Sequence, residues 1–240
     1  MENLKLSDKY KNILQKLTQD LKDVYQEGLV SIILYGSAVS GEFVDKHSNL
    51  NLLVVLKSTD LENLKKSSKL IRKFNMINTL FLTENYIANS IDIFPIEFLD
   101  IQENHFVIYG KNILKDIHID MCNLRFQCEH ELKAKLLKLR QAYLMLHDNA
   151  TTLRNLLFLS FTSILHIIRN VLRLKGKEPP YLKQDILKEI GMEFKIDIIL
   201  WEKILAAKNK NVKLSGKEIE QLFISFVREL ESIVAIIDKL

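Results

Sequence analysis

A chain of 240 residues with 48% hydrophobic and 27% charged residues has the composition of a folded globular protein, which excludes disorder over most of its length. The formal charge of +4 is only mildly basic. Proteins that bind nucleic acid usually gather Lys and Arg on one face, so this charge balance gives no reason to expect nucleic acid as a partner.

The first half of the chain mixes helical and strand patterns. Apolar residues at spacings of three and four indicate amphipathic helices, and short, nearly continuous apolar runs indicate strands that are buried on both faces. In chain order, the predicted elements are a helix at 6–27, strands at 29–35 and 50–56, a helix at 61–74, a strand at 77–82 and a strand at 95–101 that opens at Pro95.

From about residue 119 onward the period is that of helices, and strand signals vanish. Short loops between the helices predict a bundle, and Ser215 with Glu218 is the pattern of a capping box. We therefore expect an α+β protein with domains at 1–115 and 116–240. The predicted helices of the second domain lie at 120–148, 151–174, 180–190, 196–207 and 215–238.

The stretch 153–174 is apolar and long enough to cross a bilayer. It contains Arg154, His166, Arg169 and Arg173, and charged groups at mid-membrane are costly. We interpret it as a buried helix of the bundle, so no membrane partner is expected.

Two cysteines, Cys122 and Cys128, lie in the first helix of the predicted bundle, where their spacing places them on different faces. A simple disulfide between them is therefore excluded. The N-terminus has a Lys every few residues and no apolar run of the length that a signal peptide needs. These observations predict a cytoplasmic protein with reduced thiols.

Residues 32–56 read IILYGSAVSGEFVDKHSNLNLLVVL: a strand, Gly36-Ser37, a loop, then Ser48, Asn49 and a second strand that contains Asn51. This segment resembles the nucleotidyltransferase superfamily, where Gly-Ser ends one strand and Asp-x-Asp opens the next, often after a Ser. The resemblance implies an N-terminal mixed β-sheet with helices. It also implies that Gly36 lets the backbone approach a nucleotide phosphate, whose oxygens Ser37 and nearby amides hold.

In that family two aspartates, with a third carboxylate from a later strand, bind two divalent ions. The corresponding residues here are Asn49 and Asn51, and the strand predicted at 95–101 points to Glu97 as the third, with Asp100 as the alternative. Amides are neutral, whereas Mg²⁺ is usually anchored by carboxylates. We therefore expect no metal in this site, and Mg²⁺ or Mn²⁺ only if the protein is an active enzyme.

The order of domains resembles kanamycin nucleotidyltransferase and the minimal nucleotidyltransferases, whose helical bundle is related to HEPN domains. Some HEPN domains are ribonucleases with an Arg followed at a short spacing by His. Arg125 with His130, and Arg140 with His147, have similar spacings. Both pairs fall on the first bundle helix, whereas the family motif lies late in the bundle, so we interpret them as coincidence.

Three functions are compatible with these residues. The first is a catalytically degenerate nucleotidyltransferase-like protein that binds a nucleoside triphosphate, another phosphate-bearing ligand or a protein partner without turnover. The second is an active metal-dependent enzyme that transfers NMP to a small molecule or protein. In it, either Asn49, Asn51 and Glu97 support one metal ion, or Asp45, Asp92 or Asp100 replaces a lost acid from a neighbouring position. The third is an interaction module of a toxin-antitoxin type pair, with the bundle as the surface for a homodimer or another partner.

Overall fold

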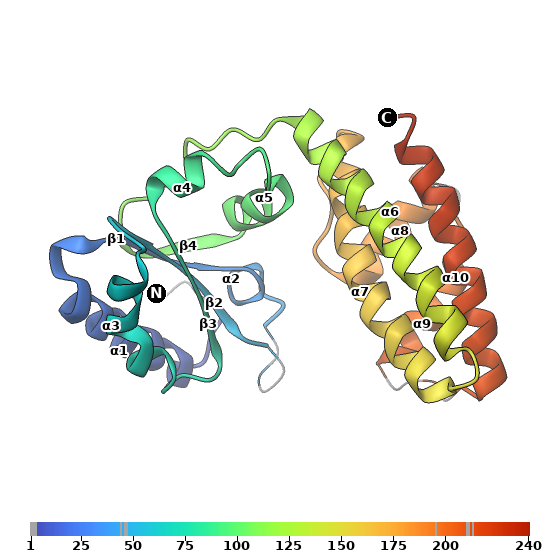
Figure 1. Ribbon diagram of the computed structural model, residues 1–240, viewed down its shortest axis with the longest axis horizontal. Coiled ribbons are helices and arrows are strands. Elements are labelled where there is room, and N and C mark those ends of the chain that lie inside the picture. Colours follow the sequence, from blue (N-terminus) through green and yellow to red (C-terminus); the bar gives the residue numbers. More distant parts are fainter. Residues whose placement is uncertain (1–3, 44, 46–47, 195, 210–211, 213) are drawn as a thin grey trace. The chain divides into compact units, whose positions relative to one another are not determined.

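The computed structural model describes residues 4–43, 45, 48–194, 196–209, 212 and 214–240. The chain divides into two compact units, Met1–Ile119 and Asp120–Leu240 (Figure 1). The first unit contains the sheet and the second is helical, which confirms the predicted α+β class. The division lies slightly beyond the boundary at 115/116 that the sequence suggested.

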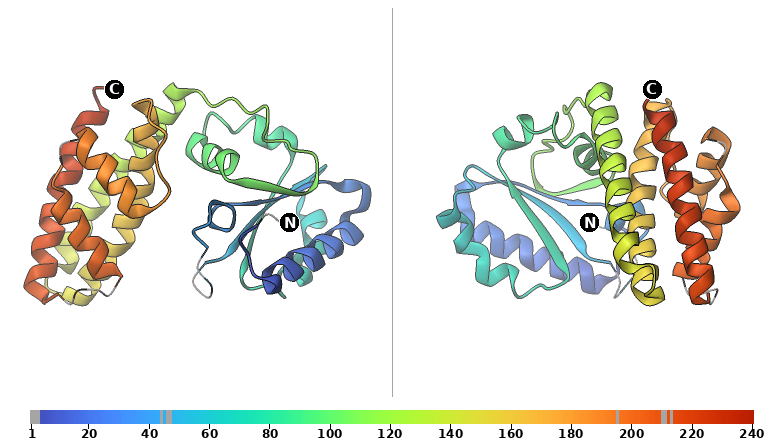
Figure 2. Two further views of the ribbon diagram at one scale, coloured as in Figure 1. Left: turned by 180° about the vertical axis from the view of Figure 1, so that it is seen from behind. Right: turned by 45° about the vertical axis from the view of Figure 1, so that its right-hand side comes forward.

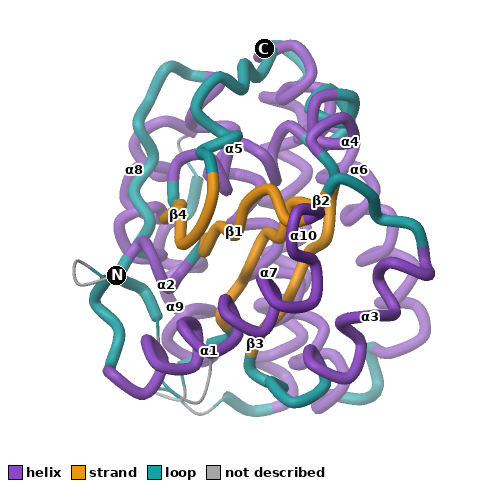
Figure 3. The backbone as a smooth tube through the Cα atoms, turned by 90° about the vertical axis from the view of Figure 1, so that its left-hand side faces the viewer, coloured by secondary structure: helices purple, strands orange, loops and turns teal. Residues whose placement is uncertain are grey.

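Within its described residues, the first unit is built on a four-stranded mixed sheet with the order β3-β2-β1-β4 (Figure 3). β1 is antiparallel to both β2 and β4, whereas β2 and β3 are parallel. β1 and β2 are almost entirely buried, as their continuous apolar runs predicted. The strands are β1 (Leu29–Tyr35), β2 (Leu50–Leu56), β3 (Ile77–Leu82) and β4 (His105–Gly110).

Two helical layers cover this sheet, one on each face (Figures 1 and 2). Leu52 and Val54 of β2 pack in the layer that contains the long N-terminal helix. Leu53 and Val55 alternate with them and pack in the opposite layer. The first layer is formed by α1 (Asp8–Tyr25) and α3 (Leu61–Ile71), and the second by α4 (Glu84–Ala88) and α5 (Pro95–Glu103).

The stretch that begins at Pro95 forms helix α5, so the strand predicted there is wrong. Pro95 occupies the start of the helix, where its fixed φ and missing N–H are tolerated. Ile96, Phe98 and Ile101 are all buried, and the alternation of the first two mimicked a strand. The strand that completes the sheet is β4, which the sequence analysis missed.

The described part of the second unit contains five helices, as the 3.6-residue period predicted. α6, α7 and α10 are the long ones and pack against one another along the unit (Figure 2). The capping box at α10 is confirmed, because the Ser215 N–H donates to the Glu218 carboxylate at 2.8 Å. The helices are α6 (Met121–Leu146), α7 (Ala150–Leu174), α8 (Lys183–Phe194), α9 (Ile198–Lys208) and α10 (Gly216–Ile237).

An aromatic cluster lies in the core of the second unit. Trp201 on α9 is fully buried, with its ring centroid 5.6 Å from that of Phe161 on α7 and 5.1 Å from that of Phe226 on α10. These rings connect three helices. The structure also leaves both cysteines as free thiols, with Cys122 exposed and Cys128 buried.

Helix α7 is long and apolar enough by composition to span a membrane. However, 56% of its most apolar window is buried within the protein, and it packs against α6, α8 and α10. Its apolar character is therefore explained by its central place in the helical unit.

Candidate functional site

The start of β2 carries the two asparagines that the sequence analysis singled out. Asn49 immediately precedes the strand and is exposed, and Asn51 is its second residue and is half-buried. Strand alternation places Asn51 on the same face as Leu53, which packs in the α4 and α5 layer. The buried Leu50 between the two asparagines points to the opposite layer and anchors this end of the strand.

Strand β3 brings a third asparagine to the same place. Asn78 pairs in register with Asn51 across the parallel β2 and β3 strands. The Asn78 Nδ2 donates a hydrogen bond to the Asn51 Oδ1 at 3.3 Å. We call Asn49, Asn51 and Asn78 the amide cluster. Asn78 was not predicted from the sequence, because only the order of strands in the sheet places it beside Asn51.

The Gly36-Ser37 turn lies beside this cluster. Gly36 has φ 75° and ψ −144°, a conformation that residues with a side chain rarely adopt. A Cβ at this position would also lie 3.2 Å from the Asn51 Nδ2. The Gly36 N–H donates to the carbonyl of Asn104 at 3.0 Å, which fixes the turn, and Ser37 begins the short helix α2 (Ser37–Ser40). Glycine is thus needed both for the turn and for the close approach of the amide.

Glu97, the residue expected to supply the third carboxylate, lies on helix α5 and not on a strand. Its side chain is exposed, and Asp100 is half-buried on the same helix. The strand on which this match depended does not exist, so the position of Glu97 within the site stays a prediction. The strand pairing brings Asn78 beside Asn51.

The acidic residues considered as replacements are dispersed. Tyr10 of α1 donates its hydroxyl hydrogen bond to the Asp45 carboxylate, and Asp92 lies in an exposed turn. Among the described residues, no group of three or more His, Cys, Asp or Glu side chains is placed to hold a metal ion. The amide cluster itself offers three neutral side chains, which is a poor match for two divalent cations.

A tyrosine lies on the strand beside the cluster. Tyr35, at the end of β1, pairs in register with Asn51. Burial raises the pKa of the Tyr35 hydroxyl above its usual value, so this phenol stays neutral at physiological pH. The side chains of the amide cluster and the Tyr35 phenol are therefore polar groups without charge.

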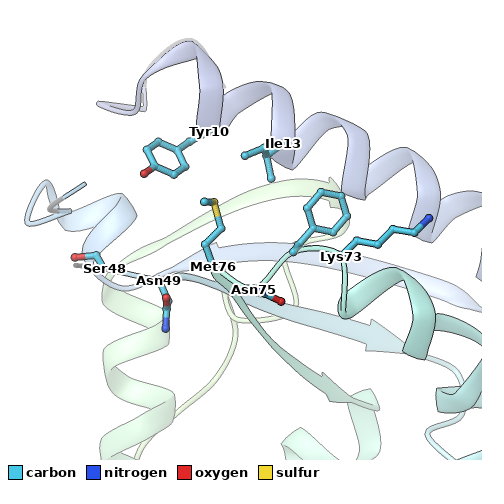
Figure 4. Close-up of a pocket in the computed structure, with 8 residues that line it drawn as sticks. Tyr10, Ile13, Ser48, Asn49, Lys73, Asn75 and Met76 are labelled. Carbon is cyan, nitrogen blue, oxygen red and sulfur yellow. The ribbon is translucent and has the colours of Figure 1, made fainter. Parts of the chain in front are cut away.

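A cavity of about 600 Å³ lies next to the cluster but on the α1 side of the sheet (Figure 4). Ser48 and Asn49 border it, and Lys73 supplies a positive charge. Figure 4 shows the Asn49 side chain pointing away from Tyr10 and Met76, which line the cavity. The cavity and the amide cluster therefore share the segment before β2 while lying on different faces of it.

The arginines of the two Arg and His pairs form contacts within the second unit. Arg125 lies 3.3 Å from the Glu129 carboxylate and donates to the carbonyl of Ile237 at 3.4 Å. Arg140 forms an ion pair of 2.8 Å with Glu231. Both arginines therefore connect α6 to α10 or its end, as expected of residues that hold a bundle together.

The chain is similar to solved structures of nucleotidyltransferases. It matches spectinomycin adenyltransferase AAD(9) from Enterococcus faecialis, determined with ATP and spectinomycin, with a TM-score of 0.58 and 13% identity over 90% of this chain and 99% of that chain. A nucleotidyltransferase-like protein from Exiguobacterium sibiricum 255-15 matches with a TM-score of 0.40 and 16% identity over 92% and 74%. No family model and no curated protein matches the sequence. The likeness to AAD(9) shows a nucleotidyltransferase-like fold.

Proposed function

We propose that this chain is a catalytically degenerate nucleotidyltransferase-like protein that binds a nucleotide, or another phosphate-bearing ligand, without transferring it. The amide cluster carries this proposal. In the family that the motif resembles, carboxylates stand before and within the strand after Gly-Ser, and a later strand supplies the third. Here β2 and the adjacent β3 present Asn49, Asn51 and Asn78.

The chemical consequence follows from charge. Two-metal transfer of a nucleotide requires cations that stabilise the attacking and leaving oxygens. Three amides bring no negative charge to hold such ions, whereas Mg²⁺ is usually bound through one or two carboxylates. Without these acids, the chain can keep its fold but lacks the negative charge that would bind the divalent cations of the reaction.

Ligand binding is supported by the part of the motif that remains. The Gly36 turn keeps its special backbone conformation beside the cluster, and Ser37 follows it directly. AAD(9), which has a similar fold, was crystallised with ATP. We infer that a nucleoside triphosphate is the first ligand to test.

An assay with the full chain and ATP labelled at the α-phosphate tests this proposal. Binding should be measurable by calorimetry, while no label should pass to spectinomycin, to other small acceptors or to protein in Mg²⁺ or Mn²⁺. Label transfer that Glu97→Ala abolishes and Glu103→Ala, on the same helix, retains would contradict the proposal. It would establish the active enzyme as the function.

That active enzyme is the second candidate, and the similarity to an adenyltransferase is the observation that favours it. In this case Glu97 or Asp100 of α5 would have to supply the missing charge. A homodimer or a protein partner also stays a prediction, which light scattering of the purified chain would test.

A further inference from the structure

The side chain of Asn51 has a defined direction within the amide cluster. Its Oδ1 accepts the hydrogen bond from Asn78 of the neighbouring strand, at 3.3 Å. Its Nδ2 is the atom that a Cβ on Gly36 would approach to 3.2 Å. The oxygen of this amide is thus directed to β3, and its two N–H donors lie at the glycine turn.

This direction decides which ligands the amide suits. A metal ion binds the oxygen of an amide, and here one of the two lone pairs of that oxygen already accepts the hydrogen bond from Asn78. A phosphate oxygen binds N–H donors, which are the groups that Asn51 presents at the Gly36-Ser37 turn. A hydrogen bond from a neutral donor to a charged acceptor is stronger than one between neutral groups.

The charge of the amide cluster also favours a phosphate over a metal ion as the ligand. Carboxylates at these positions would repel a polyphosphate unless cations lay between them. The amides remove this repulsion and supply donors in its place. Asn49 and Asn78 are both exposed, so a ligand can reach the cluster from solvent.

We propose that the amide cluster and the Gly36-Ser37 turn bind an unchelated polyphosphate, with amide N–H groups taking the place that divalent cations hold in the enzymes. This inference rests on the proposed nucleotide-binding function and specifies its ligand as the metal-free form. Because Mg²⁺ binds the same phosphate oxygens, it competes with the amides and does not assist them.

Calorimetric titration of the full chain with ATP, once in EDTA and once in excess Mg²⁺, tests this inference. We expect ATP to bind more tightly in EDTA than in Mg²⁺, and inorganic tripolyphosphate to compete with it. Binding that is equally tight or tighter in Mg²⁺ would overturn the metal-free site while leaving the proposed function intact. If neither ATP nor tripolyphosphate bound in either condition, the metal-free site and the proposed function would both be overturned.

Two variants test whether ATP binds at the amide cluster. Asn51→Asp and Asn78→Asp each place a carboxylate in the cluster, so each should weaken ATP binding in EDTA by tenfold or more and recover part of it in Mn²⁺. Asn85→Asp, the same change on the exposed start of α4, is the matched control and should bind ATP like the wild type. Circular dichroism checks that each variant is folded.

Asn78 is exposed at the edge of the sheet, so Asn78→Asp keeps the test valid if Asn51→Asp fails to fold. Wild-type ATP affinity in EDTA for a folded Asn78→Asp protein would show that the ligand does not contact the cluster and would overturn the inference.

Discussion

The first unit contains a very close approach of backbone to backbone, whereas the second unit is filled by side chains that pack between long helices. At Gly110, a Cβ would lie 2.0 Å from the carbonyl oxygen of Val30 in the neighbouring strand. The second unit instead buries a cluster of aromatic rings around Trp201. An added side-chain atom at Gly110 should therefore destabilise the first unit, and removal of buried volume at Trp201 should destabilise the second.

The largest effect should follow from Gly110→Ala. Gly110 has φ 80°, and its new Cβ would meet the backbone of Val30 and Ser31, which cannot move without breaking the pairing of β1 with β4. We expect a loss of more than about 4 kcal/mol in the free energy of unfolding of the first unit. Urea unfolding followed by far-UV circular dichroism measures it.

Gly176→Ala, in the second unit, is the control for this prediction. Gly176 has a similar φ of 71°, but a Cβ there would meet nothing within 4 Å. The only cost is that of holding an alanine in the left-handed backbone conformation, so the free energy of unfolding of the second unit should fall by about 1–2 kcal/mol. Equal losses for the two variants would show that the close approach at β4 is not what holds the first unit.

Trp201→Ala should have the next largest effect, because it empties the centre of the aromatic cluster. Large-to-small changes of buried aromatic residues cost about 3–5 kcal/mol. Trp201→Phe retains most of the volume and should cost clearly less. Thermal unfolding of both variants, followed by circular dichroism, measures these losses. If Trp201→Ala and Trp201→Phe had similar melting temperatures, the aromatic cluster would not determine the stability of the second unit.

A smaller effect is expected from Ser215→Ala, which removes the capping box of α10. The Ser215 Oγ accepts from the Glu218 N–H, and loss of such a cap costs about 1 kcal/mol. Trp201 is the single tryptophan of the chain and lies in the same unit, so its fluorescence reports the change during urea unfolding. Ser232→Ala, further along the same helix, is the control and should leave the midpoint unchanged.

The smallest predicted effect is a pH dependence at the same cap. Hydrogen bonds from the Ser215 backbone N–H and hydroxyl lower the pKa of the Glu218 carboxyl below its usual value. Its contribution to stability is therefore fully present above the unfolded pKa of about 4.3 and is lost as the pH falls through the lower folded pKa. In Ser215→Ala, unfolding should depend less on pH between about 5 and 3. If the free energy of unfolding changed with pH as steeply in Ser215→Ala as in the wild type, this prediction would be contradicted.

The sequence predicted the central elements well because their signals are local. The runs at 29–35, 50–56 and 77–82 coincide with β1, β2 and β3, since strands buried on both faces need continuous apolar residues. The helices of the second unit followed from their period and caps. The α5 error was avoidable in part, because a proline ahead of an apolar stretch also marks the first turn of a helix.

The candidate site was only half predictable. Gly36, Asn49 and Asn51 lie within one short motif, so their proximity could be inferred from spacing alone. Asn78 reaches the site through the parallel pairing of β2 with β3, which sequence spacing does not reveal. β4 was missed although residues 106–109 are a continuous apolar run typical of a strand, because the preceding stretch at 95–101 was interpreted as the strand instead.

The position of β4 has a consequence for how the protein folds. This strand closes the sheet against β1, and the Ser31 hydroxyl donates at 2.8 Å to the carbonyl of Lys111, 80 residues further along the chain. Contacts of such separation form slowly, because a long loop must be ordered first. The second unit also has contacts of long separation, because α10 packs against α6 and α7. During refolding, the slow steps should therefore be the docking of β4 in the first unit and of α10 in the second.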